Sequence, residues 1–221
     1  MFESARLVFV ALPTVLLACL SVLPVSAACP FVLNELMASN STTASDPQNE
    51  YDDWIELHNS SHTSANAAGL YLTDDPENPT RWQIPLDKQA LTTVPASGFL
   101  LIWADGQTTA SGLHAGFKLN ADGGSLYLFD ADGVTLLDAV PFDRQVPDVS
   151  YGRDPDAAGD WGFMPLPTPG KSNGTAALGV VSDVRFSRER GFYESSFDVT
   201  LSCETPGATI YYTTDGSEPG R

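Results

Sequence analysis

The sequence has few positively charged residues and few histidines. Lys and Arg together number 11, against 28 Asp and Glu and only three His, so the formal net charge is −17. A protein of that charge repels a phosphate backbone, which makes nucleic acid a poor partner. The sequence also lacks a Gly-x-Ser-x-Gly elbow, a phosphate-binding loop and a His-Glu-x-x-His helix. We therefore expect no enzymatic activity in the 221 residues.

Helical patterns are missing as well. Beyond the N-terminal region, no apolar repeat of 3.6 residues persists for three turns, whereas Gly (18) and Pro (16) are plentiful. Hydrophobic residues make up 43% of the chain and aromatic residues 10%, which is enough for a packed core and argues against disorder. This balance favours a turn-rich, all-β protein.

The N-terminal region has the pattern of a secretory signal peptide. Arg6 precedes an apolar run over residues 7–23, and small residues follow at positions 25–28. We predict cleavage after Ala27 or Ala28, which makes the protein secreted or bound to the cell surface, with no transmembrane segment in the mature chain. The alternatives are a membrane anchor, disfavoured because prolines interrupt the run, and a lipoprotein with lipid on Cys29.

Short β-type runs separated by Asp, Asn, Gly, Ser and Pro clusters fill the next part of the chain. Nine such runs in this length predict a β-sandwich. They cover residues 31–37, 54–59, 70–73, 81–84, 99–104, 114–119, 125–129, 135–142 and 149–152.

Alternation within these runs predicts which side chains are buried. In residues 54–59, Ile55 and Leu57 point one way and Trp54, Glu56 and His58 the other, so we expect one buried and one amphipathic face. The predicted core residues are Ile55, Leu57, Leu70, Leu72, Leu126 and Leu128.

The mature chain divides into two predicted units. The first covers residues 29–173, a linker of small residues covers 174–180, and a second β unit covers 181–221. The second unit offers strands at 197–203 and 208–213, which leave a sheet edge open and a core unfinished. We therefore expect the chain to end inside a domain and to be the front piece of a longer protein.

The first unit resembles a bacterial lamin-tail domain, a module with an immunoglobulin-like sandwich. The resemblance rests on ordered motifs rather than on any one of them. They are Leu33-Asn-Glu-Leu-Met-Ala-Ser-Asn40, Asp53-Trp-Ile-Glu-Leu-His-Asn59, Gly69-Leu-Tyr-Leu-Thr-Asp-Asp75, Arg81-Trp-Gln-Ile-Pro85, Gly98-Phe-Leu-Leu-Ile-Trp-Ala104, Leu113-His-Ala-Gly-Phe-Lys-Leu119, Ser150-Tyr-Gly-Arg153 and Pro167-Thr-Pro-Gly170. The implied fold is an immunoglobulin-like β-sandwich followed by an incomplete second module.

The second unit resembles the first part of a chitobiase C-terminal type of module. The resemblance rests on Gly191-Phe-Tyr-Glu194 and Thr214-Asp-Gly-Ser-Glu-Pro219. Such modules accompany extracellular hydrolases and surface proteins. In bacteria this pair of modules often precedes a kinase-like domain of the spore-coat CotH type, and the resemblance implies such a domain beyond Arg221.

Two acidic clusters, at residues 46–53 and 74–78, are candidates for a calcium site, because carboxylate oxygens in loops suit Ca²⁺. The alternative is that they are solvated turn residues. The candidate ligands are Asp46, Glu50, Asp52, Asp74 and Asp75.

Histidine and cysteine offer weaker candidates. His58 and His62 are four residues apart, which suits a zinc pair poorly in extended structure, so we expect both at a solvated strand end. We expect His114 to be a partly buried imidazole bonded to a loop carbonyl. Cys29 and Cys203, the two cysteines after the leader, form either a disulfide or two separate thiols.

Aromatic side chains and one carboxylate pair suggest two alternatives that involve sugars. Exposed rings stack on sugars, although a small sandwich usually buries its tryptophans. The candidate rings are Trp54, Trp82, Trp103, Tyr151 and Trp161. Asp53 and Glu56 are a conceivable glycosidase pair, but no second element places an acid and a base across a cleft.

These observations favour an exported, noncatalytic β-sandwich module that spaces, anchors or docks a larger protein. Its partner would be a protein or a surface polysaccharide. The alternatives are a carbohydrate-binding module and an accessory part of an enzyme whose catalytic domain follows residue 221. A flat, solvent-facing row of at least two aromatic rings would favour carbohydrate binding.

Overall fold

The structure is a computed structural model that describes residues 29–177 and 179–220. The predicted leader, residues 1–28, lies outside the described residues and stays a prediction. The elements, in chain order, are β1 (Phe31–Met37), β2 (Trp54–Asn59), β3 (Ala65–Asn66), β4 (Tyr71–Thr73), β5 (Trp82–Gln83), α1 (Gln89–Thr92), β6 (Thr93–Val94), β7 (Phe99–Ala104), β8 (His114–Ala115), β9 (Gly124–Phe129), β10 (Leu136–Phe142), β11 (Ser150–Asp154), β12 (Asp160–Met164), β13 (Arg185–Phe186) and β14 (Leu201–Ser202).

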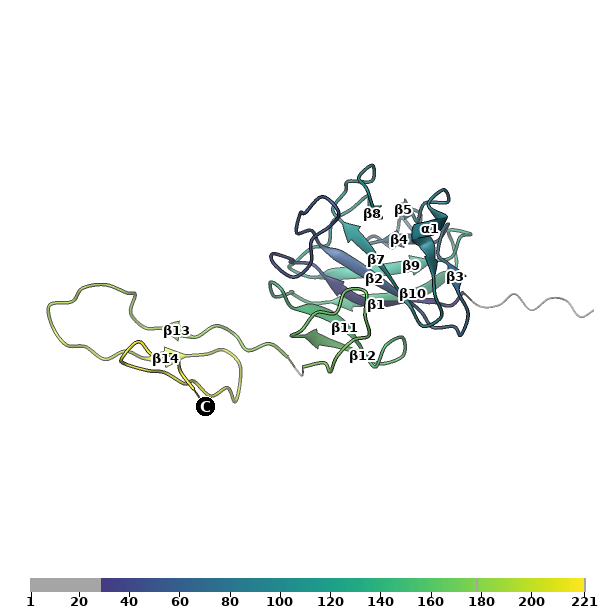
Figure 1. Cartoon of the computed structure of the whole chain (residues 1–221). Coiled ribbons are helices and arrows are strands. Elements are labelled where there is room, and N and C mark those ends of the chain that lie inside the picture. Colours follow the sequence, from purple (N-terminus) through teal and green to yellow (C-terminus); the bar gives the residue numbers. More distant parts are fainter. Residues whose placement is uncertain (1–28, 178, 221) are drawn as a thin grey trace, which may run out of the picture.

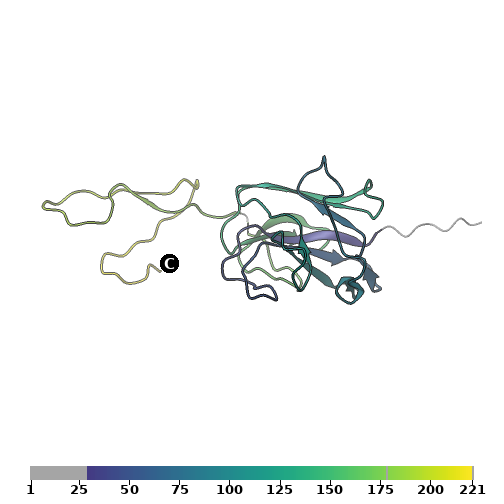
Figure 2. The same ribbon diagram turned by 90° about the horizontal axis from the view of Figure 1, so that it is seen from above.

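Two sheets form the main body (Figure 1, Figure 2). One has six strands in the order β12-β11-β1-β2-β7-β8, and the other has four in the order β10-β9-β4-β5. Neighbouring strands are antiparallel except for β7 and β8, which are parallel. The fold is the predicted all-β, immunoglobulin-like sandwich.

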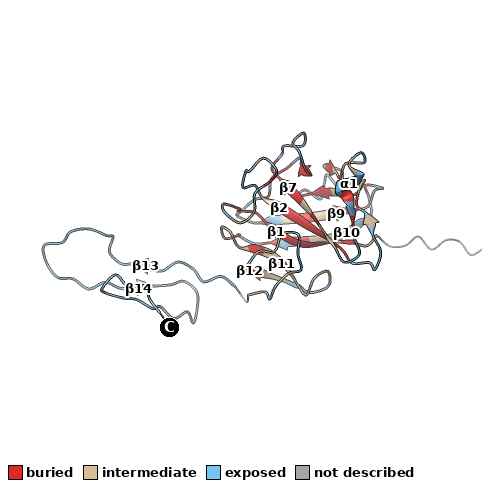
Figure 3. Ribbon diagram, in the orientation of Figure 1, coloured by how far each residue is buried: buried red, intermediate tan, exposed pale blue. Residues whose placement is uncertain are grey.

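Buried residues lie along the strands of both sheets (Figure 3). The apolar side chains that these strands turn inward make the core. Each of the six residues predicted to be buried lies in this core. Their exposed fractions are 0% for Ile55, Leu57, Leu72, Leu126 and Leu128, and 5% for Leu70. Period-two alternation therefore identified the inner face of the sandwich correctly.

The amphipathic face of β2 is buried as well as the inner face, which the alternation did not predict. All six residues of β2 are buried. Trp54 packs with Met37 and Trp103, and His58 contacts the ring of Phe99 at a centroid distance of 4.8 Å. Loops and the segment after β12 cover this face, so a half-polar strand is fully enclosed.

Strand prediction was best for the long runs. The observed bounds of β1, β2 and β7 equal the predicted ones, whereas the run predicted at 114–119 is a strand only over two residues. Alternation did not identify β3, β6, β12 or α1. The sequence of β12, Asp160-Trp-Gly-Phe-Met164, has no clean alternation, and it is a strand because it pairs with β11 along its whole length.

The part after the sandwich is thinly packed. It contains one two-stranded sheet, β13 with β14, and none of the described residues 179–220 is buried. The strand predicted at 208–213 does not form in the structure, because no neighbouring strand pairs with it. Part of the predicted linker instead joins the first sheet, since the N–H of Ala177 donates to the carbonyl of Phe163 at 2.7 Å.

Candidate functional site

The loop between β1 and β2 holds the first acidic cluster. Asp46 is 4% exposed, and its Oδ1 atom accepts hydrogen bonds of 2.8 Å from the backbone N–H groups of Gln48 and Glu50. Asn49 has a φ of 67° at the apex of this turn, a conformation that Asn tolerates. The turn thus orients the buried carboxylate with backbone donors.

Three carboxylates meet at this loop. Asp46, Glu50 and Asp52 each offer an oxygen, and these oxygens lie within 4.8 Å of one another. Burial raises the pKa of Asp52, and the nearby charge of Asp105 raises it further. Proximity of like charges is costly unless a proton or a cation compensates it.

A second group of potential ligands shares Asp46 with this cluster. The atoms of Asp46, Asp105 and His114 also lie within 4.8 Å of one another. His114 Nδ1 is 2.6 Å from Asp105 Oδ2, and His114 Nε2 donates to the carbonyl of Ser111 at 2.9 Å. Because a carbonyl only accepts, Nε2 carries a hydrogen, and one further proton lies between Nδ1 and Asp105.

That arrangement leaves His114 without a free nitrogen lone pair for a metal. The imidazole is bonded to a loop carbonyl, as predicted, but it has no exposed surface, so its burial is complete rather than partial. The sequence did not identify Asp105 as its partner. Asp105 follows β7 and His114 begins β8, so the parallel pairing of these two strands brings them together.

The other predicted acidic loop does not contribute. Asp74 forms an ion pair with Arg81, and Asp75 Oδ1 accepts the N–H of Glu77 at 3.0 Å. Neither belongs to a group of potential metal ligands among the described residues. The structure therefore brings together Asp46, Glu50 and Asp52 and leaves Asp74 and Asp75 apart.

Two buried glutamates, which the sequence did not single out as a pair, form the second polar cluster. Glu35 on β1 and Glu56 on β2 are cross-strand neighbours, 1% and 0% exposed. Burial raises the pKa of Glu56 to about 8 and also raises the pKa of Glu35. Glu56 therefore keeps its proton at neutral pH.

The residues after β12 satisfy these glutamates. Thr168 donates to Glu35 through its N–H at 3.1 Å and through its hydroxyl at 3.0 Å. The N–H of Gly170 donates to Glu56 Oε2 at 2.6 Å. We call residues 168–173 the clasp segment, because they close over the outer face of β1 and β2.

Asp53 and Glu56, considered above as a glycosidase pair, do not act together in the structure. Asp53 accepts backbone hydrogen bonds from Leu119 and Asn40, whereas Glu56 is bonded to Asn34 and Gly170. Residues an odd number of positions apart in extended chain point to opposite faces, so the two carboxyls have separate surroundings. Burial raises the pKa of Asp53 to about 6.

The aromatic candidates are mostly core. Trp54, Trp82 and Trp103 are 0%, 8% and 6% exposed. Tyr151 and Trp161 are half-buried on β11 and β12 and stack on each other at 5.5 Å, with an interplanar angle of 21°. Each of these rings covers a face of the other, so they do not form a flat row open to solvent.

His58 and both cysteines complete the predicted candidates. His58 is 7% exposed, which corrects the expected solvated position, and burial lowers its pKa. His62 is exposed, as expected. Cys29 and Cys203 are free thiols, and Cys203 Sγ donates to the carbonyl of Ser182 at 3.2 Å.

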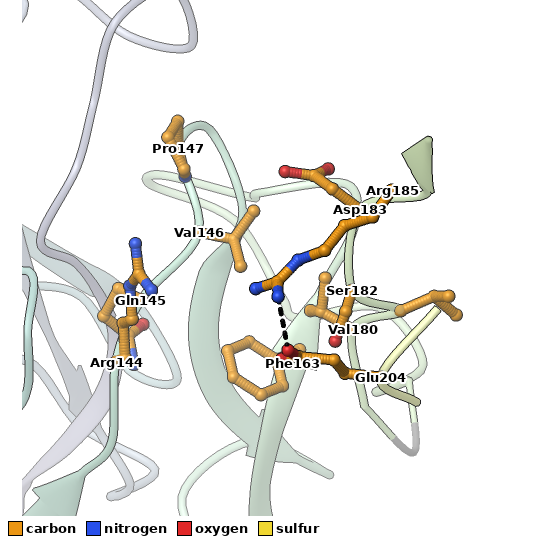
Figure 4. A pocket seen from close by; sticks show the side chains of 11 residues that line it. Arg144, Gln145, Val146, Pro147, Phe163, Val180, Ser182, Asp183, Arg185 and Glu204 are labelled. Atoms are coloured by element: carbon orange, nitrogen blue, oxygen red, sulfur yellow. Dashed lines mark ion pairs between the residues drawn. The ribbon is translucent and has the colours of Figure 1, made fainter. Parts of the chain in front are cut away.

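A pocket lies between the loop after β10 and the segment around β13 (Figure 4). Arg144 and Phe163 line one side, and Asp183 lies on the other. Arg185 and Glu204, from the part of the chain around β13 and β14, form an ion pair of 2.9 Å at this pocket, although both side chains are mostly exposed. The charges of Arg185 and Glu204 compensate each other, whereas Asp183 belongs to none of the ion pairs among the described residues.

Comparisons with known families agree with this two-part architecture. Residues 24–143 match the family described as Lamin Tail Domain, and residues 189–221 match the Chitobiase/beta-hexosaminidase C-terminal domain. The first match spans more than half of the chain, which therefore belongs to the lamin tail domain family. No curated protein and no solved structure matches it.

The matched region and the observed sheet have different ends. The family match stops at residue 143, whereas β11 and β12 belong to the same sheet as β1 and lie beyond that residue. The clasp segment also lies outside the match. In the described part of the chain, no helix has the length and apolar character needed to cross a membrane.

Proposed function

We propose that this chain is an exported, noncatalytic module that spaces or docks its neighbours within a larger cell-surface or secreted protein. The observation that carries the proposal is the succession of two noncatalytic β-sandwich families along one chain. Modules of these kinds are often extracellular, and the signal-peptide pattern at residues 1–28 supports export.

The chemistry of the buried acids supports a structural role. A glutamic acid with a pKa of about 8 resembles a catalytic acid, because perturbed pKa values gather at active sites. Glu56, however, has no exposed surface, and its oxygens accept hydrogen bonds from Asn34 and Gly170. A substrate cannot reach it unless the clasp segment opens.

Carbohydrate binding receives less support. Sugar recognition by stacking needs a ring face that is open to solvent. The half-buried pair Tyr151 and Trp161 uses one face of each ring internally, and Arg153 lies over Trp161 at 5.0 Å from the ring centroid. We therefore favour a role in spacing or docking.

Export and the modular role are tested separately. Intact-mass analysis of the exported protein should show a start at Ala28 or Cys29, and a retained Met1 would contradict export. For the modular role, residues 31–173 of the full protein are exchanged for an unrelated β-sandwich of equal length. Unchanged surface display indicates a spacer, and loss of partner binding indicates docking.

A catalytic result would overturn the proposal. The wild-type chain and the Glu56→Gln variant are incubated with a panel of polysaccharide and peptide substrates. We expect no turnover from either protein. Turnover by the wild type that the variant abolishes, while the variant still unfolds cooperatively, would make the buried carboxyl catalytic.

A further inference from the structure

The loop between β1 and β2 carries oxygen-bearing side chains at alternate positions. These are Asp46, Gln48, Glu50 and Asp52. The oxygens of its three carboxylates lie within 4.8 Å of one another. Two oxygens bound to one Ca²⁺ at about 2.3–2.6 Å are separated by at most about 5 Å, so the spacing fits a shared calcium ion.

Several buried oxygens of this loop have no hydrogen-bond donor within the described residues. They are Asp46 Oδ2, Gln48 Oε1 and Asp52 Oδ2. Asp46 is more than nine-tenths buried, and only its other oxygen is used by the backbone. Buried polar groups are almost always satisfied, and an acceptor without a donor costs about 1–3 kcal/mol. Three such acceptors in one loop indicate a missing donor or cation.

No Lys, Arg or His side chain of the described residues forms an ion pair with the carboxylates of this loop. Among the described residues, none of the ion pairs within 4.0 Å involves Asp46, Glu50 or Asp52. The nearest imidazole, that of His114, is bonded to Asp105 and Ser111 on its two nitrogens. Lys118 acts on Asp52 only through its charge at longer range, so no side-chain cation in the described part of the chain is in direct contact with the three carboxylates.

The donor set selects the kind of ion. Carboxylate and amide oxygens are hard ligands that suit Ca²⁺, whereas Zn²⁺ prefers nitrogen and sulfur. The one imidazole in reach has no free lone pair, which disfavours zinc. Glu50 is exposed, and Gln107 Nε2 donates to its Oε2 at 3.0 Å, so this side of the site is open for water ligands.

We propose that this loop binds one Ca²⁺ ion through the carboxylates of Asp46, Glu50 and Asp52, with the side-chain oxygen of Gln48 as a further ligand. The ion would neutralise the cluster and hold the loop between β1 and β2 against the loop that precedes β8. The site does not depend on the role proposed for the whole module.

The test compares two acidic loops in the same protein. The chain is treated with EDTA, dialysed, and titrated with CaCl₂ from about 10 µM to 10 mM. The readouts are the heat of binding and the midpoint of thermal unfolding. An ion that binds only the folded state raises the unfolding midpoint by mass action. We expect a rise of several degrees for the wild type and for Asp75→Asn, and none for Asp46→Asn.

A folding control and a second variant distinguish loss of calcium binding from loss of folding. Asp46→Asn retains an acceptor for the backbone, and its cooperative unfolding in EDTA shows that it folds. If it does not fold, Glu50→Gln changes an exposed ligand instead and should weaken binding about tenfold or more. The proposal is wrong if CaCl₂ does not raise the unfolding midpoint of the wild type, or if Asp46→Asn and Asp75→Asn respond equally. It is also wrong if MgCl₂ has the same effect as CaCl₂.

Discussion

Glu56 on β2 accepts a hydrogen bond of 2.6 Å from the backbone N–H of Gly170, which lies 114 residues further along the chain. Its neighbour Glu35 accepts two more from Thr168. The two carboxyls thus fasten the clasp segment over the outer face of the larger sheet. A neutral acid suits this position, because burial disfavours the charged form.

The protonation of Glu56 predicts that stability depends on pH. Its pKa is raised by burial from 4.5 to about 8 in the folded protein, so the contribution is fully present below about pH 4.5 and is lost as pH rises through 8. Between pH 6.5 and 8.5 we expect the free energy of unfolding to fall by about 1 kcal/mol per pH unit. Denaturant titrations at each pH measure this slope.

Glu56→Gln isolates that contribution. The variant removes the titrating group, so the slope above pH 6.5 should become small, whereas Glu77→Gln, at an exposed position, should leave it unchanged. The chosen window lies above the pKa of about 6 of Asp53 and above the range of His58, whose pKa is lowered. Equal slopes in the wild type and Glu56→Gln would show that another group is responsible.

The core position of Leu57 predicts a large cost of truncation. Leu57 has no exposed surface between the two sheets, so Leu57→Ala should lower the free energy of unfolding by about 2–5 kcal/mol. Leu166, at 82% exposure, is the matched control, and Leu166→Ala should change it by less than about 0.5 kcal/mol. An unchanged denaturation midpoint for Leu57→Ala would contradict the burial of Leu57 in a close-packed core.

The buried pair of Asp105 and His114 predicts a second large effect. Both side chains have no exposed surface, and Asp105→Ala leaves the imidazole without its partner, which should cost about 3–5 kcal/mol. The exposed pair of Arg144 and Asp122, at 4.0 Å, is the control, and Asp122→Ala should have almost no effect. Similar losses of unfolding free energy in Asp105→Ala and Asp122→Ala would show that burial does not set the cost of breaking an ion pair here.

The charge predicts the absence of nucleic-acid binding. With a net charge of −17 and 11 Lys and Arg in the whole chain, of which only Arg185, Arg188 and Arg190 lie close together in the sequence, counterion release from DNA is too small to offset the repulsion. We expect no retention of duplex DNA in a mobility-shift assay at about 0.1 M salt. Retention that weakens as salt rises would contradict the electrostatic argument itself.

The sequence alone determined the fold class and the inner face of the sandwich. The bounds of β1, β2 and β7 and the burial of Ile55 and Leu57 follow from alternation, because successive side chains of a strand point to opposite faces. The same local rule made His58 appear solvated. Alternation shows which residues share a face, but it does not show what covers that face.

Tertiary structure alone decided the polar clusters. The pairing of Asp105 with His114 depends on two parallel strands, and the buried Glu56 is bonded to the clasp segment more than 100 residues away. Asp46 and Asp75 occupy similar acidic loops in the sequence, yet only Asp46 is buried beside other carboxylates. Burial and the distance between charges set their energies, and both come from contacts between residues that are remote in the chain.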